Sequence, residues 1–200
     1  MIITSERRTM AEVADSTFLG SSKQEELLQS LDDARKCIES SAMRMFNELN
    51  ENTRLSEEKK HIKKVNIVGY LEALHELKYM RKDIVEHDCT NYEVFWYRDY
   101  KLQIFRDYVT GHLCGYIEPD DKMRIHHDEE EMDRLFHGGE TAGFGFDCAH
   151  HGYDFFLGNY FDHRNPGYTR VYRDYNFVKK NLEDVVDWFY EQYEKDEKDE

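Results

Sequence analysis

The apolar pattern of the chain changes near residue 90, and this change constrains the fold more than any other feature. Before it, apolar residues recur every three or four positions from Leu27 to Ile84, which is typical of amphipathic helices. After it, aromatic residues dominate, and 24 of the 28 Phe, Trp and Tyr residues lie in 91–200. Short runs of aromatic and β-branched residues indicate strands. The sequence therefore predicts two differently built segments, 1–90 and 91–200.

The first segment predicts a helical hairpin over 22–88. Ser22 and Glu25 have the spacing of a capping box, and the first apolar stripe follows them. A polar break at 50–53 separates this stripe from a second one. The second stripe begins after Ser56, with two acidic residues in its first turn, as expected at the start of a helix.

The second segment predicts a small antiparallel sheet closed by a C-terminal helix. We expect extended runs over 92–97, 102–108, 109–117 and 139–149, with one or two helical turns over 128–136. Apolar residues at helical spacing predict the closing helix over 176–193. Because a hairpin and a small sheet would each leave an apolar face uncovered, we expect the two segments to pack as one cooperative α+β unit.

Charge and cysteine spacing limit the classes of function. The chain carries 42 acidic and 27 basic side chains, a net charge of −15, which argues against sequence-independent binding to nucleic acids. No apolar run approaches the ~20 residues of a membrane-spanning helix, and the first 20 residues lack the apolar stretch of a signal peptide. Cys37, Cys89, Cys114 and Cys148 lie far apart, which favours reduced thiols. We therefore expect a cytoplasmic protein that does not associate with membranes.

The densest group of chemically active side chains lies between residues 137 and 154. Glycines in this region would let a ligand approach the backbone, while imidazole, hydroxyl and carboxylate groups would supply polar contacts. Neighbouring aromatic residues suit a polar ligand that contains a ring. The candidate ligand-binding residues are His137, Gly138, Gly139, Thr141, Asp147, His150 and Asp154.

Three motifs in this half resemble a family of small uncharacterised proteins encoded by bacteriophages and prophages. They are G-x-x-C-G-Y at 111–116, H-G-G-x-T at 137–141, and G-F-D-C-A-H at 145–150 followed by Gly152 and Asp154. In the family the final acid directly follows the glycine, so Tyr153 is an insertion here, and Glu140 stands where the family has an apolar residue. The resemblance covers 108–195. It implies a small α+β domain in a phage accessory protein that works in the host cytoplasm, with no established reaction to carry over.

Three other interpretations of the same residues stay open. In a catalytic one, Cys148 is the nucleophile, His137 or His150 is the base, and Asp147 or Asp154 orients the imidazole. In a structural one, His137 and Asp147 are satisfied polar groups that lock a loop. In a third, a zinc ion supports a hydrolase, although alternation along a strand would let only some of the donors converge. The zinc donors would come from His137, Asp147, Cys148, His150 and His151.

A further alternative uses the acidic residues of 120–133, which could imitate nucleic-acid phosphates on a basic host enzyme. These residues are Asp120, Asp121, Asp128, Glu129, Glu130, Glu131 and Asp133. The favoured interpretation is a phage-encoded accessory protein for host takeover or counter-defence. It would act by binding a polar or nucleotide-like ligand, or a host or defence protein, at the site around His137, Asp147, Cys148 and His150. We expect no resident cofactor, with zinc as the alternative.

Overall fold

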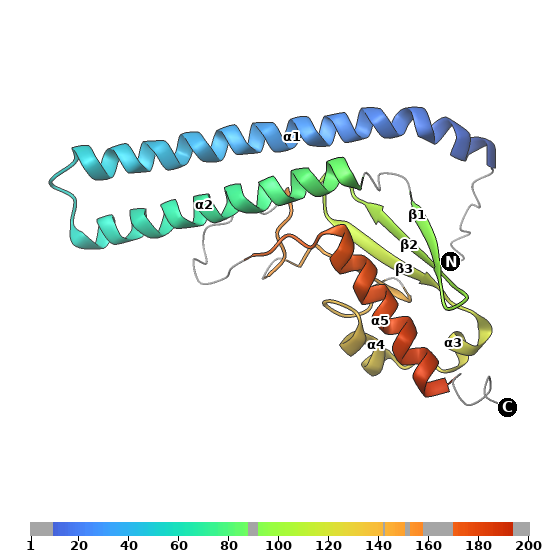
Figure 1. Cartoon of the computed structure of the whole chain (residues 1–200). Coiled ribbons are helices and arrows are strands. Elements are labelled where there is room, and N and C mark those ends of the chain that lie inside the picture. Colours follow the sequence, from blue (N-terminus) through green and yellow to red (C-terminus); the bar gives the residue numbers. More distant parts are fainter. Residues whose placement is uncertain (1–9, 88–91, 142, 151–152, 158–169, 194–200) are drawn as a thin grey trace, which may run out of the picture.

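The structure is a computed structural model of the 200-residue chain. It describes residues 10–87, 92–141, 143–150, 153–157 and 170–193, with side chains from Ser22 onward. Two long N-terminal helices, a four-stranded antiparallel sheet and a C-terminal helix on that sheet make up the fold (Figure 1). The expected α+β class is confirmed.

Helices α1 (Met10–Glu51) and α2 (Glu57–Glu86) form the predicted hairpin. The expected end of α1 and start of α2 are confirmed, since the Ser56 side chain accepts a hydrogen bond from Lys59 N at 3.3 Å and caps α2. The expected start of the first helix at Ser22 is wrong, because α1 begins twelve residues earlier. No proline interrupts 10–21, so the helix continues through Ser22, whose side chain bonds to Glu26 on the same helix.

A shared apolar core holds the two helices together near the sheet. It combines residues of both helices with two aromatic residues from the loop before the C-terminal helix. The cluster consists of Leu27, Leu31, Ala34, Ile38, Tyr70, Ala73, Leu77, Met80, Ile84, Phe155 and Tyr172. No side chain from 39 to 69 is buried, and the end of the hairpin projects away from the sheet (Figure 1). Among the described helices, none is long and apolar enough to span a membrane.

Four antiparallel strands follow one another across the sheet in chain order. They are β1 (Glu93–Tyr97), β2 (Tyr100–Arg106), β3 (Leu113–Glu118) and β4 (Gly145–Asp147). Arg98 and Asp99 both have positive φ, at 46° and 67°, and make the tight turn between β1 and β2. The expected strand over 109–117 starts four residues late, because the Asp107 carboxylate accepts the backbone N–H groups of Val109 and Thr110 and holds them in a turn.

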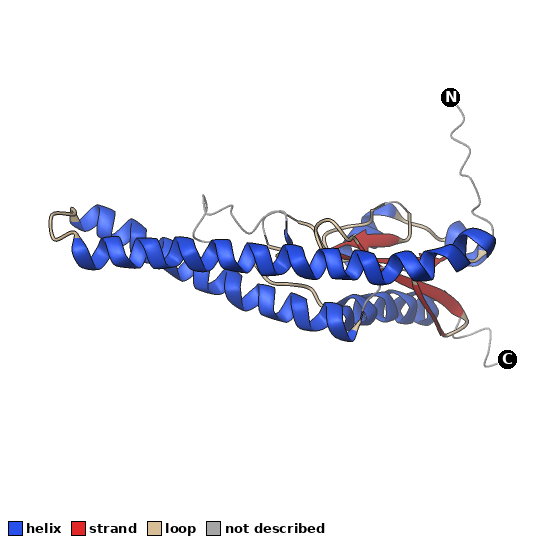
Figure 2. Cartoon of the chain, turned by 90° about the horizontal axis from the view of Figure 1, so that it is seen from above, coloured by secondary structure: helices blue, strands red, loops and turns tan. Residues whose placement is uncertain are grey.

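Helix α5 (Tyr175–Tyr193) covers one face of the sheet, as predicted for 176–193. Figure 2, a view from above, shows α5 beneath the strands, on the side away from α1. The helical turns expected over 128–136 are confirmed by α4 (Glu129–Leu135), which follows the short helix α3 (Asp121–Ile125). The extended run expected over 139–149 is reduced to the three residues of β4.

A buried charged network joins the hairpin to the sheet. Arg106 on β2 is 1% exposed, and its Nη2 lies 2.8 Å from Oδ2 of Asp83 on α2. The hydroxyl of Tyr172 donates to the same Oδ2 at 2.7 Å and also contacts the guanidinium. The backbone N–H of Tyr175 donates to Asp83 Oδ1 at 3.1 Å, and Arg106 Nη1 donates to the Gly111 carbonyl at 2.9 Å. The two predicted segments therefore contact each other through polar as well as apolar side chains. That they unfold as one cooperative unit stays a prediction.

Candidate functional site

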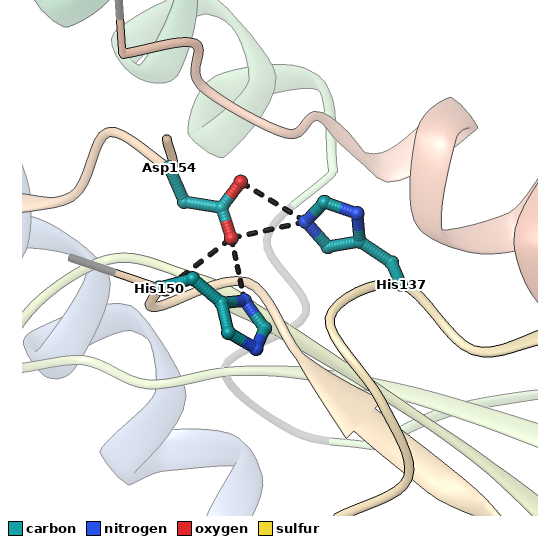
Figure 3. Close-up of side chains that lie close together, drawn as sticks. All are labelled: His137, His150 and Asp154. Carbon is teal, nitrogen blue, oxygen red and sulfur yellow. Dashed lines mark hydrogen bonds and ion pairs between the residues drawn. The ribbon is translucent and has the colours of Figure 1, made fainter. Parts of the chain in front are cut away.

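A wholly buried carboxylate, that of Asp154, lies between two imidazoles (Figure 3) and also bonds to a guanidinium. Its Oδ2 lies 2.8 Å from His150 Nδ1 and 3.0 Å from His137 Nε2. Its Oδ1 lies 3.0 Å from His137 Nε2 and accepts a hydrogen bond from Arg173 Nε at 3.1 Å. We call these four residues the Asp154 centre.

The four residues come from three separate parts of the chain. His137 follows α4, and its backbone N–H donates to the Asn181 side chain of α5 at 3.2 Å. His150 follows β4, and the N–H of Asp154 donates to the His150 carbonyl at 2.9 Å. Arg173 lies just before α5. The backbone hydrogen bond between Asp154 and His150 keeps Asp154 beside the His150 imidazole.

Asp154 is held in its charged form. Burial by itself would raise the pKa of this carboxyl, but the hydrogen bonds from His137 and His150, with the further bond from Arg173, outweigh burial and lower the pKa below its ordinary value. A charged carboxylate fixes the orientation of each ring, because one ring nitrogen must face it. The other nitrogens, His137 Nδ1 and His150 Nε2, lie on the far side of their rings (Figure 3).

The centre reaches the surface beside aromatic rings. The side chains of His137, His150 and Arg173 are 13%, 21% and 25% exposed. The Tyr153 ring stacks on the His150 ring, with centroids 5.1 Å apart and an angle of 9°, and the Arg173 guanidinium lies 4.7 Å from the centroid of the Phe177 ring. Polar groups and half-exposed aromatic surface therefore occur together.

The candidate residues of the H-G-G-x-T segment shape the loop. Gly138 has a φ of +76°, and a Cβ atom there would collide with the His150 ring, so the glycine makes room for that imidazole. The N–H of Gly139 donates to the Phe136 carbonyl at 3.0 Å, and the N–H of Thr141 donates to the Gly145 carbonyl at 2.7 Å. These two N–H groups are thus engaged within the protein.

Cys148 and Asp147 lie outside the Asp154 centre. Cys148 is 2% exposed in the core beneath the sheet, and burial raises the pKa of its thiol well above the ordinary value. Neither His137 nor His150 bonds to it in the described part of the chain. Asp147 Oδ1 accepts the N–H of Ala149 at 3.0 Å. Among the described residues the donors that converge are therefore His137, His150 and Asp154, while His151 lies outside the described residues.

The described cysteines agree with the expected reduced thiols. Cys37, Cys114 and Cys148 are free, and Cys89 lies outside the described residues. Burial, the largest cause, raises the pKa of Cys114 to about 12. Cys114 is therefore as poorly suited to thiolate chemistry as Cys148.

Arg173 belongs to the centre although nothing in the sequence pointed to it. It is a single basic residue between Tyr172 and Asp174, without a motif around it. Only its position in the folded structure identifies it, because there it bonds to a buried acid. Its two terminal nitrogens make no hydrogen bond to the described residues, so they can serve a ligand.

Most of the acidic residues proposed for phosphate mimicry have contacts within the protein. The carboxylate of Asp128 caps α4 by accepting the N–H of Glu131 at 3.1 Å. Glu129, Glu130 and Glu131 occupy the first turn of α4, where negative charge stabilises a helix. Asp133 Oδ1 accepts the N–H of Glu140 at 2.9 Å. The acidic run therefore stabilises its own helix and loop.

The Asp154 centre combines a buried acid, two imidazoles and a guanidinium, which are groups that bind anions, metal ions and polar organic ligands. Comparison of the chain with protein-family models, curated proteins and solved structures finds no match. The chemistry of the centre is consequently argued from its own geometry.

Proposed function

We propose that the chain is a phage-encoded accessory protein for host takeover or counter-defence, and that it acts by binding a polar ligand at the Asp154 centre. One observation supports this proposal above the others. A wholly buried carboxylate holds two imidazoles and a guanidinium at partly exposed positions. The phage context comes from the resemblance of the motifs at 111–154.

The cost of burying Asp154 supports a built site. An ionised carboxylate is expensive to bury unless it is paired and hydrogen-bonded. The chain meets this requirement with side chains that reach the surface, and it uses Gly138 to seat one of them. A buried carboxylate that only fixed a loop in place would be paired equally well by side chains that are fully buried.

The surroundings favour a ligand that combines polar groups with a ring. Arg173 has free terminal nitrogens among the described residues, and the outer nitrogen of each imidazole can donate or accept. Tyr153 is 41% exposed and parallel to His150, so a planar ligand could stack beside it. Nucleotides and related compounds have both features.

Binding is favoured over covalent catalysis. A cysteine nucleophile requires a thiolate and a base within hydrogen-bond reach. Burial raises the pKa of Cys148, and no described imidazole bonds to its thiol. The acidic-inhibitor alternative is also less favoured, because the acidic run has contacts of its own in and around α4.

The proposal is tested with variants inside and outside the centre. His150→Gln removes an imidazole that faces Asp154, whereas His126→Gln removes an exposed imidazole that stacks on Tyr193 far along α5. Binding of ribonucleotides and inorganic phosphate would be followed by thermal shift and calorimetry, and the phenotype by phage-infection assay. We expect His150→Gln to stay folded and lose binding and phenotype, and His126→Gln to keep both. A folded His150→Gln protein with full phenotype would refute the proposal.

A further inference from the structure

We infer that the Asp154 centre is a binding site for a divalent first-row metal ion of the zinc type, held by His137 Nε2, His150 Nδ1 and Asp154 Oδ2. This inference rests on the proposed function, because the ion would be the part of the site to which a polar ligand attaches. One donor atom of each of these three residues lies within 4.8 Å of the other two.

The distances are close to those that a metal ion needs. Zinc binds imidazole nitrogen and carboxylate oxygen at about 2.0–2.1 Å, which places neighbouring tetrahedral donors about 3.3 Å apart. Asp154 Oδ2 lies 2.8 Å from His150 Nδ1 and 3.0 Å from His137 Nε2. The two imidazole nitrogens lie within 4.8 Å of each other, so an adjustment of the two rings toward a spacing of about 3.3 Å would admit the ion.

Arg173 takes the role of an outer partner to the carboxylate. It bonds to Oδ1, so Oδ2 is the oxygen that faces both imidazoles. Carboxylates that bind metals are commonly held by a hydrogen bond to their second oxygen, which fixes their orientation. The charge of Arg173 would lower the affinity for a cation, but it would also attract an anionic ligand to the open side of the ion.

The remaining support is already in place around the three donors. His137 is fixed through its backbone by Asn181, and the His150 ring lies against Gly138 and Tyr153. When the inner nitrogen of a ring binds the ion, the ring proton lies on the outer nitrogen.

The donor set selects the class of metal. Two nitrogen donors disfavour Mg²⁺ and Ca²⁺, which prefer oxygen, and favour zinc or its first-row neighbours. Three protein donors leave at least one coordination position for water or a ligand, as in catalytic rather than structural zinc sites. The nearby thiol of Cys148 does not complete a closed site, because it is buried in the apolar core.

Calorimetric titration of the full chain, purified without a histidine tag and stripped with a chelator, tests the inference directly. We expect about one Zn²⁺ per chain and no heat of binding with Mg²⁺. His150→Gln and His137→Gln should each weaken Zn²⁺ binding at least tenfold, while His126→Gln should bind like the unmodified chain. The visible absorption of bound Co²⁺ should indicate nitrogen and oxygen donors without thiolate.

Two results would overturn the inference. The first is a folded, unmodified chain that binds no Zn²⁺, and the second is equal Zn²⁺ affinity in folded His150→Gln and His137→Gln proteins. Nucleotide binding separates this failure from that of the proposed function. If the chain binds no Zn²⁺ but binds nucleotides or phosphate in a His150-dependent way, the metal inference fails and the proposed function survives. If neither metal nor nucleotide binds, both fail.

Discussion

Removing Asp83 should destabilise the chain strongly, because this carboxylate neutralises the buried guanidinium that joins the hairpin to the sheet. Arg106 is 1% exposed and Asp83 is 6% exposed. In Asp83→Leu the guanidinium would keep partners such as the Gly111 carbonyl and the Tyr172 hydroxyl, but it would lose the charged partner that pairs with it among the described residues. Removing a charged partner from a buried guanidinium is unfavourable.

The expected magnitude follows from the burial of the pair. Breaking a buried ion pair by removing one partner costs about 3–5 kcal/mol. For a chain of this length, a loss of about 1 kcal/mol lowers the melting temperature by roughly 2–4 °C, so Asp83→Leu should lower it by roughly 6–20 °C. Arg106→Met should cost less, because Asp83 would keep two donors, the Tyr172 hydroxyl and the Tyr175 N–H.

Urea unfolding followed by circular dichroism would measure both variants and their combination. The double variant should lose less stability than the sum of the two single variants, since neither charge is left unpaired. Glu86→Gln is the matched control, because Glu86 pairs with Lys82 on the exposed side of α2 at 3.7 Å and should contribute little. If Asp83→Leu destabilises the chain by less than about 1 kcal/mol, or if the single variants add, the proposed role of the network is refuted.

Three further outcomes are expected. Iodoacetamide near neutral pH should label exposed Cys37 before Cys148, whose thiol pKa is raised by burial, and mass spectrometry showing faster labelling of Cys148 would restore the nucleophile interpretation. Gly138→Ala should destabilise the chain and displace the His150 ring in NMR spectra, whereas Gly143→Ala, which also has positive φ but open space around it, should cost less and leave the ring in place. The hairpin and the sheet should unfold in a single calorimetric transition, and two separate transitions would contradict their cooperativity.

Periodicity predicts the helices and most strands because local apolar spacing reports which face of an element is buried. The second helix starts where Ser56 indicates, and α5 starts within one residue of the expected position. Ser22 predicts the start of the first helix wrongly, because a capping signature does not prevent a helix from extending further toward the N-terminus. The late start of β3 depends on the Asp107 side chain, which captures two backbone N–H groups and overrides the β-propensity of Val109 and Tyr108.

The residue types between 137 and 154 predict where the site lies, but they do not predict which of its side chains contact one another. His137, His150 and Asp154 were predicted as ligand-binding residues, and the structure brings them together. Sequence spacing does not distinguish these residues from Asp147, whose carboxylate accepts the backbone N–H of Ala149 instead. Arg173 was missed because its relation to Asp154 arises from two loop segments that meet in space, a contact without local periodicity.

The network beneath the hairpin and the Asp154 centre are joined through adjacent residues. Tyr172 contacts Asp83, while Arg173, next along the chain, contacts Asp154. One short segment before α5 therefore serves both clusters.

This arrangement leads to a last prediction, that the site depends on the hairpin. In Asp83→Leu, Tyr172 loses its acceptor, and the segment that carries Arg173 should shift relative to Asp154. We expect Zn²⁺ binding to weaken in this variant when it is measured well below its melting temperature, and to stay unchanged in the control Glu86→Gln. If Asp83→Leu is destabilised but binds Zn²⁺ as the unmodified chain does, the two clusters are energetically independent, and the hairpin is not needed to position the site.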